Sequence, residues 1–273
     1  MTGPGTVPDS SKKPPVTRWT WIPVLLFFAG LCAATFVKIH NFDIFHRLVV
    51  GNEIIRHGQI DFPNPFNYTS TDEVYANESW LFDVPMALLA GLDKDNLTAL
   101  IIVKVILFAL IFIVLYRALI KNGTPKTAAI LLLLLAFVIL SFRLYIRNFL
   151  FSYLFVAILI SVLYSDSRAD RPDKRMIWLF PCIMILWNNI HAFCIFGFFI
   201  IGAALVSELI RLLFFKQKQR APHVKIIAIA LAATLPAVFV SPHPGYFIER
   251  FWVHMAVYPS LIVSLEEMSP PLP

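Results

Sequence analysis

Long apolar runs recur through this chain and constrain its fold more than any other feature. A helix rises about 1.5 Å per residue, so about 20 apolar residues cross the roughly 30 Å hydrocarbon core of a bilayer. The runs of suitable length cover residues 19–38, 98–119, 126–142, 148–164, 176–190, 192–211 and 224–240. We therefore expect an all-α integral membrane protein with about seven transmembrane helices.

The composition excludes an ordinary soluble domain and argues against a nucleic-acid-binding protein. Hydrophobic residues make up 58% of the chain and charged residues only 15%, whereas soluble domains carry about 25% charged residues. The formal net charge is +6, but the Lys and Arg residues stand in short clusters between apolar runs. Such clusters are typical of topology signals at membrane edges. We expect the lipid bilayer, and no nucleic acid, as a partner.

The distribution of basic residues predicts how the chain is threaded through the membrane. A shorter apolar stretch at 80–92 contains Asp83 and Pro85, and we interpret it as an interfacial helix. If that helix lies flat, most of the Lys and Arg residues fall in the N-terminal tail and in the loops on the same side of the membrane as this tail. Because basic residues gather on the cytoplasmic side, we expect the N-terminus inside and the C-terminus outside. The expected parts are a disordered cytoplasmic tail (1–17) and one transmembrane domain (18–273), with a first extracytoplasmic loop (39–97) and an extracytoplasmic C-terminal segment (241–273).

The apolar run from 176 to 210 is too long for one span and must contain a turn. As one helix it would measure roughly 52 Å, and its strongly polar interruption is Asn188, Asn189 and His191. The first arm is short, which places the turn slightly below the outer surface, facing a cavity. Polar groups at that depth need partners and are functional candidates. A hydrogen-bonded turn that holds two helices together is the structural alternative.

The first loop combines an amphipathic helix with an irregular segment. Residues 42–57 place apolar side chains in a roughly helical rhythm, so we expect a helix on the membrane surface that Gly58 ends. Residues 61–68 (DFPNPFNY) contain two prolines and two asparagines, which predict an irregular loop. A loop of this length is uncommon unless it is functional or disordered, and its aromatic residues argue against disorder.

Several short motifs follow one another along the first loop and the outer helix ends. They read DIFH at 43–46, PNPFNYT at 63–69, NESWL at 77–81, RN at 147–148, WNNIH at 187–191, SPHPGY at 241–246 and EEMSP at 266–270. Together they resemble the signature of a bacterial branch of the GT-C membrane glycosyltransferases, which typically reads Asp-x-Trp-x-His, Pro-x-x-Asp-Pro-Phe-Ser-Tyr-Thr and, later, Trp-x-Asn-x-His. The chain departs from that pattern at Phe45, Asn64, Asn67, Asn148 and Met268, and Asn64 removes a loop carboxylate. Members usually extend further, so the chain resembles a short or truncated one.

The resemblance implies a GT-C-like fold and an enzyme that moves a sugar from a polyprenyl-phosphate donor to an acceptor at the outer face of the bacterial cytoplasmic membrane. The acceptor class (glycan, lipid or protein) stays open, as does a divalent cation such as Mg²⁺ or Mn²⁺. Carried over residue by residue, the resemblance makes Asp43 the catalytic base. The substrate-binding residues that it implies are His46, Glu78, Trp80, Arg147, Trp187, Asn189 and His191, and Arg143 is added because it stands four residues before Arg147 on the expected outer side.

These assignments have structural alternatives. Asp43 could be a solvated loop acid or a charge stabilised by the dipole at a helix N-terminus. Arg143 and Arg147 are four residues apart, so on a helix they share one face and could clamp a lipid phosphate, or they could snorkel at the interface. His46 and Glu53 also fit a structural role in the loop. The alternative function is a non-catalytic scaffold or a transporter subunit, and transport is weakened because the polar groups gather at one face.

Overall fold

A computed structural model describes most of the chain. It covers residues 21–39, 42–63, 66, 74–75, 77–93, 97–141, 144–245, 248 and 252. Several predicted features lie outside the described residues: the cytoplasmic tail (1–17), Arg143, the departure positions Asn64 and Asn67, and the last motif (266–270).

Helices follow all seven apolar runs of the sequence. They are α1 (Ile22–Thr35), α4 (Thr98–Lys121), α5 (Lys126–Leu140), α6 (Phe149–Ser167), α7 (Met176–Ile190), α8 (Ile195–Leu213) and α9 (Ala221–Ala237). Among the described residues, three helical segments are long and apolar enough to cross a membrane, namely α4, α6 and the run Ala192–Leu213, which joins the 3-10 helix η3 (Ala192–Cys194) to α8. These three candidate spans indicate a multi-pass membrane protein. The count of seven spans and the orientation of the termini remain predictions.

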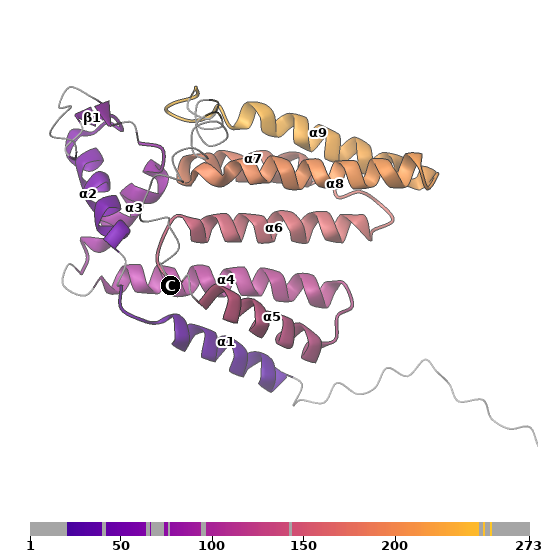
Figure 1. Ribbon diagram of the computed structural model, residues 1–273, viewed down its shortest axis with the longest axis horizontal. Coiled ribbons are helices and arrows are strands. Elements are labelled where there is room, and N and C mark those ends of the chain that lie inside the picture. The colour runs from indigo at the N-terminus through magenta and orange to yellow at the C-terminus, as the bar shows by residue number, and fades with distance from the viewer. Residues whose placement is uncertain are drawn as a thin grey trace, which may run out of the picture.

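The predicted turn near residues 188–191 is confirmed. α7 ends at Ile190, and His191 has an extended backbone (φ −158°, ψ 137°) before η3 and α8 begin. α7 and α8 both pack against α9, and the long axes of α4, α6, α8 and α9 run along the length of the molecule (Figure 1). Asn188 Nδ2 donates to the carbonyl of Val238 at the end of α9 (2.7 Å), so the turn is held to its neighbour by a hydrogen bond.

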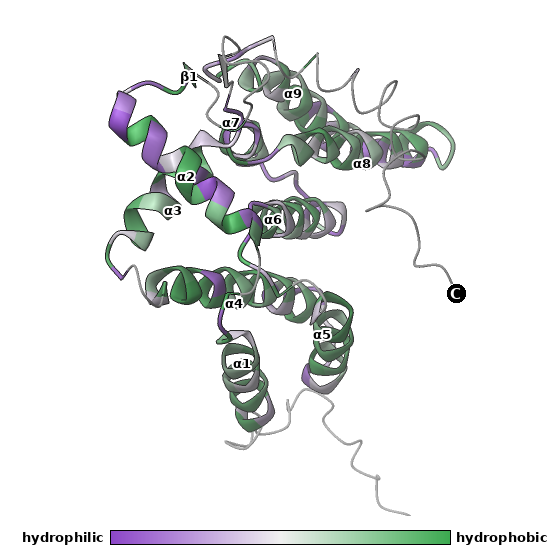
Figure 2. Cartoon of the chain, turned by 60° about the vertical axis from the view of Figure 1, so that its left-hand side comes forward, coloured by the Kyte–Doolittle hydropathy of each residue, from purple (hydrophilic) through white to green (hydrophobic). Residues whose placement is uncertain are grey.

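The outer surface of the helices is apolar, as expected of a protein in lipid. Figure 2 shows hydrophobic colouring along most of α1, α4 and α5. On α5 the exposed large apolar side chains are Leu131, Leu132, Leu134, Leu135, Val138 and Ile139. A soluble monomer rarely exposes such a contiguous apolar patch. These side chains therefore fit contact with lipid tails.

Two large apolar clusters, and a small one around Phe62, form the core of the described residues. One joins α6, α7, α8 and α9 to the first-loop helices, and Trp187, Phe180 and Met184 lie at its centre with no exposed surface. The other joins α1, α4, α5 and α6 around Phe108 and Phe112, which are also fully buried. α6 contributes to both clusters and so connects the two halves of the bundle.

In the described part of the first loop, two helices lie at one end of the bundle (Figure 1). α2 (Phe42–His57) matches the predicted amphipathic helix, and the left-handed Gly58 (φ 66°) follows it. α3 (Trp80–Ala90) corresponds to the predicted interfacial helix. The two helices cross at Gly51, where an added Cβ would lie 2.2 Å from the backbone oxygen of Asp83. Glycine therefore permits the close contact that fixes α2 on α3.

One strand of a small sheet lies within the segment predicted to be an irregular loop. β1 (Phe62–Pro63) pairs antiparallel with β2 (Val74–Tyr75), with Phe62 opposite Tyr75. The prediction for residues 61–68 was therefore wrong at Phe62 and Pro63. Phe62 is buried beside Val50 and Ile54 of α2, and burial of this aromatic ring stabilises the strand despite the nearby prolines.

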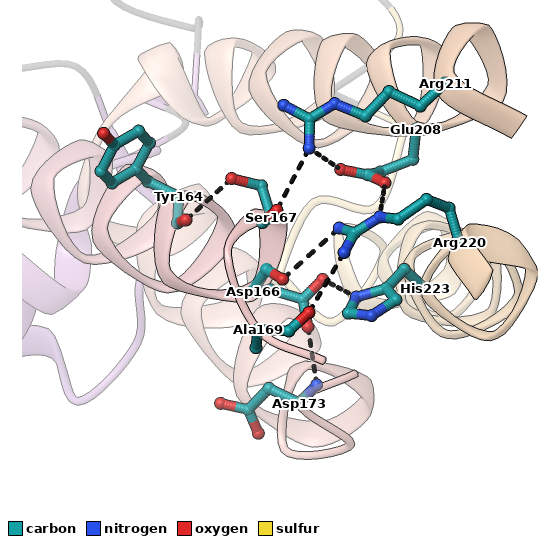
Figure 3. Close-up of polar contacts among 9 residues, drawn as sticks. All are labelled: Tyr164, Asp166, Ser167, Ala169, Asp173, Glu208, Arg211, Arg220 and His223. Atoms are coloured by element: carbon teal, nitrogen blue, oxygen red, sulfur yellow. Dashed lines mark hydrogen bonds and ion pairs between the residues drawn. The ribbon is translucent and has the colours of Figure 1, made fainter. Parts of the chain in front are cut away.

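A buried polar cluster holds the C-terminal end of α6 (Figure 3). Arg220, in the 3-10 helix η4 (Lys218–Arg220), donates through Nε to Glu208 Oε2 of α8 (2.6 Å), and Arg211 Nη1 lies 3.4 Å from Glu208 Oε1. Asp166 of α6 contacts His223 Nδ1 of α9 at 2.8 Å, and both side chains are fully buried. The cluster therefore links α6, α8 and α9. Arg220 was predicted only as a topology charge, whereas its side chain is turned inward.

Candidate functional site

A pocket of about 500 Å³ opens where the first-loop helices meet the start of α6 and the turn between α7 and α8. Four separate segments of the chain contribute its walls: residues 43–47, 78–82, 146–149 and 191–193. Its polar lining residues are Asp43, His46, Arg47, Glu78, Ser79, Arg147, Asn148 and His191. Five of the predicted site residues are thus brought to one pocket: Asp43, His46, Glu78, Arg147 and His191.

The first turns of α2 supply one wall. Asp43, His46 and Arg47 are spaced three and four residues apart, so they share one face of the helix, and all three line the pocket. The ring of His46 packs on Phe66, with 4.4 Å between the ring centres. Burial, and next the positive charge of Arg47, lower the pKa of His46, against the opposing effect of Asp43. His46 is therefore held toward its neutral form.

An ion pair joins the α2 wall of the pocket to the segment before α6. Arg147 Nη2, from the segment before α6, pairs with Asp43 Oδ2 at the start of α2. The side chains of Arg147 and Asp43 are 32% and 58% exposed, respectively. Because exposed ion pairs contribute little to stability, other charged groups can compete for both partners.

The second arginine of the pocket is anchored from behind. Arg47 Nη1 lies 3.4 Å from Oδ2 of Asp83, a carboxylate with no exposed surface, and Asn77 Nδ2 donates to the same oxygen (3.0 Å). Burial raises the pKa of Asp83 to about 6, although Arg47 and Asn77 lower it. Oδ1 of Asp83 has no hydrogen-bond partner among the described residues. The buried carboxylate therefore draws Arg47 to one position.

His191 is held rigidly at the base of the pocket. Its Nδ1 lies 2.7 Å from Oγ of Ser152, which also accepts a hydrogen bond from Nε1 of Trp187 (2.8 Å). The rings of Phe149 and Phe193 each pack 4.5 Å from the His191 ring, centre to centre. Because the Ser152 hydroxyl already accepts from Trp187, it can donate to Nδ1, which would leave the proton on Nε2.

The other predicted substrate-binding residues that the structure describes, Trp80, Trp187 and Asn189, are not among the residues that line this pocket. Trp187 is fully buried in the core. Trp80 Nε1 donates to Asn189 Oδ1 (2.8 Å), and Asn189 Nδ2 donates to the carbonyls of Ile185 and Val240 (2.8 Å each). These bonds join α3, α7 and the end of α9. These contacts match the structural alternative, a hydrogen-bonded turn that holds helices together.

Sequence reasoning missed Arg47 and the aromatic pair around His191. The spacing of Arg47 from Asp43 on the predicted helix was a usable signal, because residues four apart share a helix face. Phe149 and Phe193 had no such signal, since they were two of the 25 Phe residues of an apolar chain. Asn148 lines the pocket and donates from Nδ2 to Ser79 Oγ (3.3 Å) and to the Ile190 carbonyl (3.4 Å).

The donor set favours an anion over a metal ion. Two guanidinium groups and the carboxylates of Asp43 and Glu78 face the same cavity, and guanidinium groups bind phosphate through paired hydrogen bonds. Within the part of the chain that the structure describes, no group of three or more His, Cys, Asp or Glu side chains is arranged to hold a metal ion. The pocket can bind an anionic group and accept a proton close to it.

Comparison with known proteins finds no counterpart for this chain. No protein-family model, no curated protein and no solved structure matches it. A functional proposal therefore rests on the pocket and on the order of the sequence motifs.

Proposed function

We propose that the protein transfers a sugar from a polyprenyl-phosphate donor to an acceptor at the extracytoplasmic face of the bacterial cytoplasmic membrane. One observation carries the proposal: a single pocket of about 500 Å³ contains an exposed carboxylate, Asp43, and two guanidinium groups, Arg47 and Arg147. The pocket lies at the start of α6, a candidate span, where the phosphate of a lipid-linked donor would meet the protein. The order of motifs along the first loop supports the same reaction.

The pocket supplies the groups that such a transfer needs. The acceptor oxygen forms a bond to the anomeric carbon of the sugar, and the bond from that carbon to the phosphate oxygen breaks. Asp43 takes the proton of the acceptor hydroxyl as general base. Arg47 and Arg147 bind the phosphate and stabilise the negative charge that it gains on leaving. The carrier then departs as polyprenyl phosphate.

A transfer assay on the purified protein tests this function. The protein, reconstituted in lipid vesicles, would be incubated with a panel of radiolabelled polyprenyl-phosphate sugars and cell-envelope extracts as acceptors. Release of sugar-free polyprenyl phosphate reports turnover whatever the acceptor is. General base catalysis contributes about 10²- to 10⁴-fold, so Asp43→Asn is expected to reduce turnover by about that factor.

The matched control is Glu53→Gln. Glu53 is a carboxylate of the same helix, but it pairs with Arg56 (2.7 Å) and is not among the residues that line the pocket. We expect its loss to leave turnover unchanged. Full turnover by the Asp43→Asn protein would refute the assigned mechanism. Donor binding without any turnover by the wild-type protein would favour the alternative of a non-catalytic scaffold.

A further inference from the structure

We infer that Arg147 exchanges partners when the pocket binds its ligand: the phosphate group takes the guanidinium of Arg147 from Asp43 and so ends its ion pair with the carboxylate. The inference rests on the proposed function for the role of Asp43 as base, and it adds how that base is controlled. Its ligand is a phosphate ester with a lipid chain. The exchange requires an ion pair that a ligand can reach and a second cation that stays in place.

The accessibility of the Arg147–Asp43 pair meets the first requirement. Asp43 is more than half exposed, Arg147 is about a third exposed, and both line the pocket. Exposed ion pairs contribute little net free energy because water screens them. The phosphodiester of the donor carries one negative charge, as the carboxylate does, and likewise offers a guanidinium group two parallel hydrogen bonds. Because Arg47 holds the phosphate in the same pocket, the phosphate can compete with Asp43 for Arg147.

Arg47 meets the second requirement. Its carboxylate partner, Asp83, is completely buried in α3 and also accepts a hydrogen bond from Asn77. A ligand in the pocket cannot reach Asp83, so it cannot displace Arg47 from this partner in the way that it can displace Arg147 from Asp43. Arg47 gives the incoming phosphate a fixed cation, whereas Arg147 moves toward the phosphate from Asp43.

The exchange imposes an order on the reaction. While Asp43 is paired with Arg147, the guanidinium occupies Oδ2 of the carboxylate, and an acceptor hydroxyl has to compete for that oxygen. Once the phosphate holds Arg147, the carboxylate is available to the acceptor hydroxyl. The protein would then remove the proton of an acceptor only after the donor is bound.

Binding of sugar-free polyprenyl phosphate to the reconstituted protein tests the exchange without any chemistry. Because Asp43 competes with the phosphate for Arg147, Asp43→Asn is expected to tighten binding, by about two- to fivefold. Arg147→Gln is expected to weaken binding. In the Arg147→Gln background, Asp43→Asn should no longer tighten it, since the competition has been removed. This double-mutant cycle isolates the coupling between the two residues.

Glu78→Gln serves as the matched control, because it removes one negative charge from the same pocket. Simple repulsion of the ligand by carboxylates predicts that both acid substitutions tighten binding alike, and that Asp43→Asn still does so without Arg147. Either result would overturn the exchange. Absence of saturable binding to the wild-type protein would overturn it as well, since Arg147 would then have no phosphate to accept.

Inorganic phosphate, tested as a competitor, distinguishes the two sources of the anion. We expect it to compete only weakly, because it lacks the lipid chain. Equal affinity for inorganic phosphate would overturn the assignment of a lipid-linked ligand. The exchange and the proposed function can also fail separately. If Asp43→Asn abolishes turnover without tightening binding, the exchange fails and the function stands. If Asp43→Asn tightens binding but the wild-type protein shows no turnover, the function fails and the exchange stands.

Discussion

The contact between α2 and α3 at Gly51 determines where the pocket residues of α2 lie. An added Cβ at Gly51 would lie 2.2 Å from the backbone oxygen of Asp83 and 2.7 Å from Cβ of Ala87, whereas ordinary contacts begin at 3.4 Å. Neither atom belongs to a flexible side chain, so α2 must move away from α3 by about 1 Å. We therefore predict that Gly51→Ala destabilises the protein and displaces the pocket wall that carries Asp43 and Arg47.

The size of the effect follows from two opposed contributions. Overpacking of a core contact costs about 1–3 kcal/mol, and replacing a helical glycine by alanine returns about 0.5–1 kcal/mol. The net loss, between about 0 and 2.5 kcal/mol, corresponds to a fall of up to about 10 °C in the midpoint of thermal unfolding. Tryptophan fluorescence on heating, in detergent or nanodiscs, measures it, and the same protein should bind polyprenyl phosphate less tightly.

Two other helical glycines provide graded controls. At Gly202 in α8 an added Cβ meets nothing within 4 Å, so Gly202→Ala is expected to be neutral or slightly stabilising. At Gly197 the Cβ would lie 2.5 Å from Sδ of Met184, a flexible side chain that can move aside, so an intermediate effect is expected. If Gly51→Ala proves as stable as Gly202→Ala, α2 does not depend on this contact and the reasoning is refuted.

Two further predictions concern buried charges. Arg220→Met leaves Glu208 buried with only the half-exposed Arg211, and we expect a loss of about 3–5 kcal/mol in thermal unfolding that the double substitution with Glu208→Met largely restores. Failure of the double substitution to recover stability would contradict that account. The pKa of Asp83 in the folded protein, about 6, lies above its ordinary value of 3.8. As the pH falls, the folded protein therefore binds a proton at Asp83 before the unfolded chain does. The buried charge of Asp83 destabilises the protein at pH 7 and is lost as the pH falls through 6. The free energy of unfolding of the wild type, relative to that of Asp83→Asn, should therefore rise toward pH 4. A difference between the two proteins that stays constant with pH would refute this.

The sequence predicts most of the helices because their determinants are local. Apolar length identifies the membrane helices, and the polar cluster at Asn188, Asn189 and His191 identifies the turn between α7 and α8. The rhythm of apolar residues at 42–57, ended by Gly58, gives the bounds of α2. The gathering of five predicted residues in one pocket follows from topology, because all of them lie at helix ends expected on the same side.

The partners of each side chain could not be predicted, because they depend on packing between distant segments. Asp83 was an argument against a membrane span, and nothing local shows that it lies beneath Arg47. Arg220 has the same sequence context as the exposed basic residues around it, and only the position of Glu208 turns it inward. Trp187 and Asn189 were candidates for a ligand site because a motif cannot separate a side chain that binds ligand from one that supports its neighbours.

The two ends of α6 show how burial assigns different roles to the same chemistry. At its C-terminal end, the side chains of Arg220 and Glu208 are only 8% and 3% exposed, and exchange with an outside ligand would leave a buried charge without its partner. At its N-terminal end, the Arg147–Asp43 pair has the same types of group but is open to a pocket of about 500 Å³. Loss of the pair there costs little, because water or a ligand replaces it. Substitutions at the first end should therefore change stability, and substitutions at the second should change binding and turnover while stability is nearly preserved.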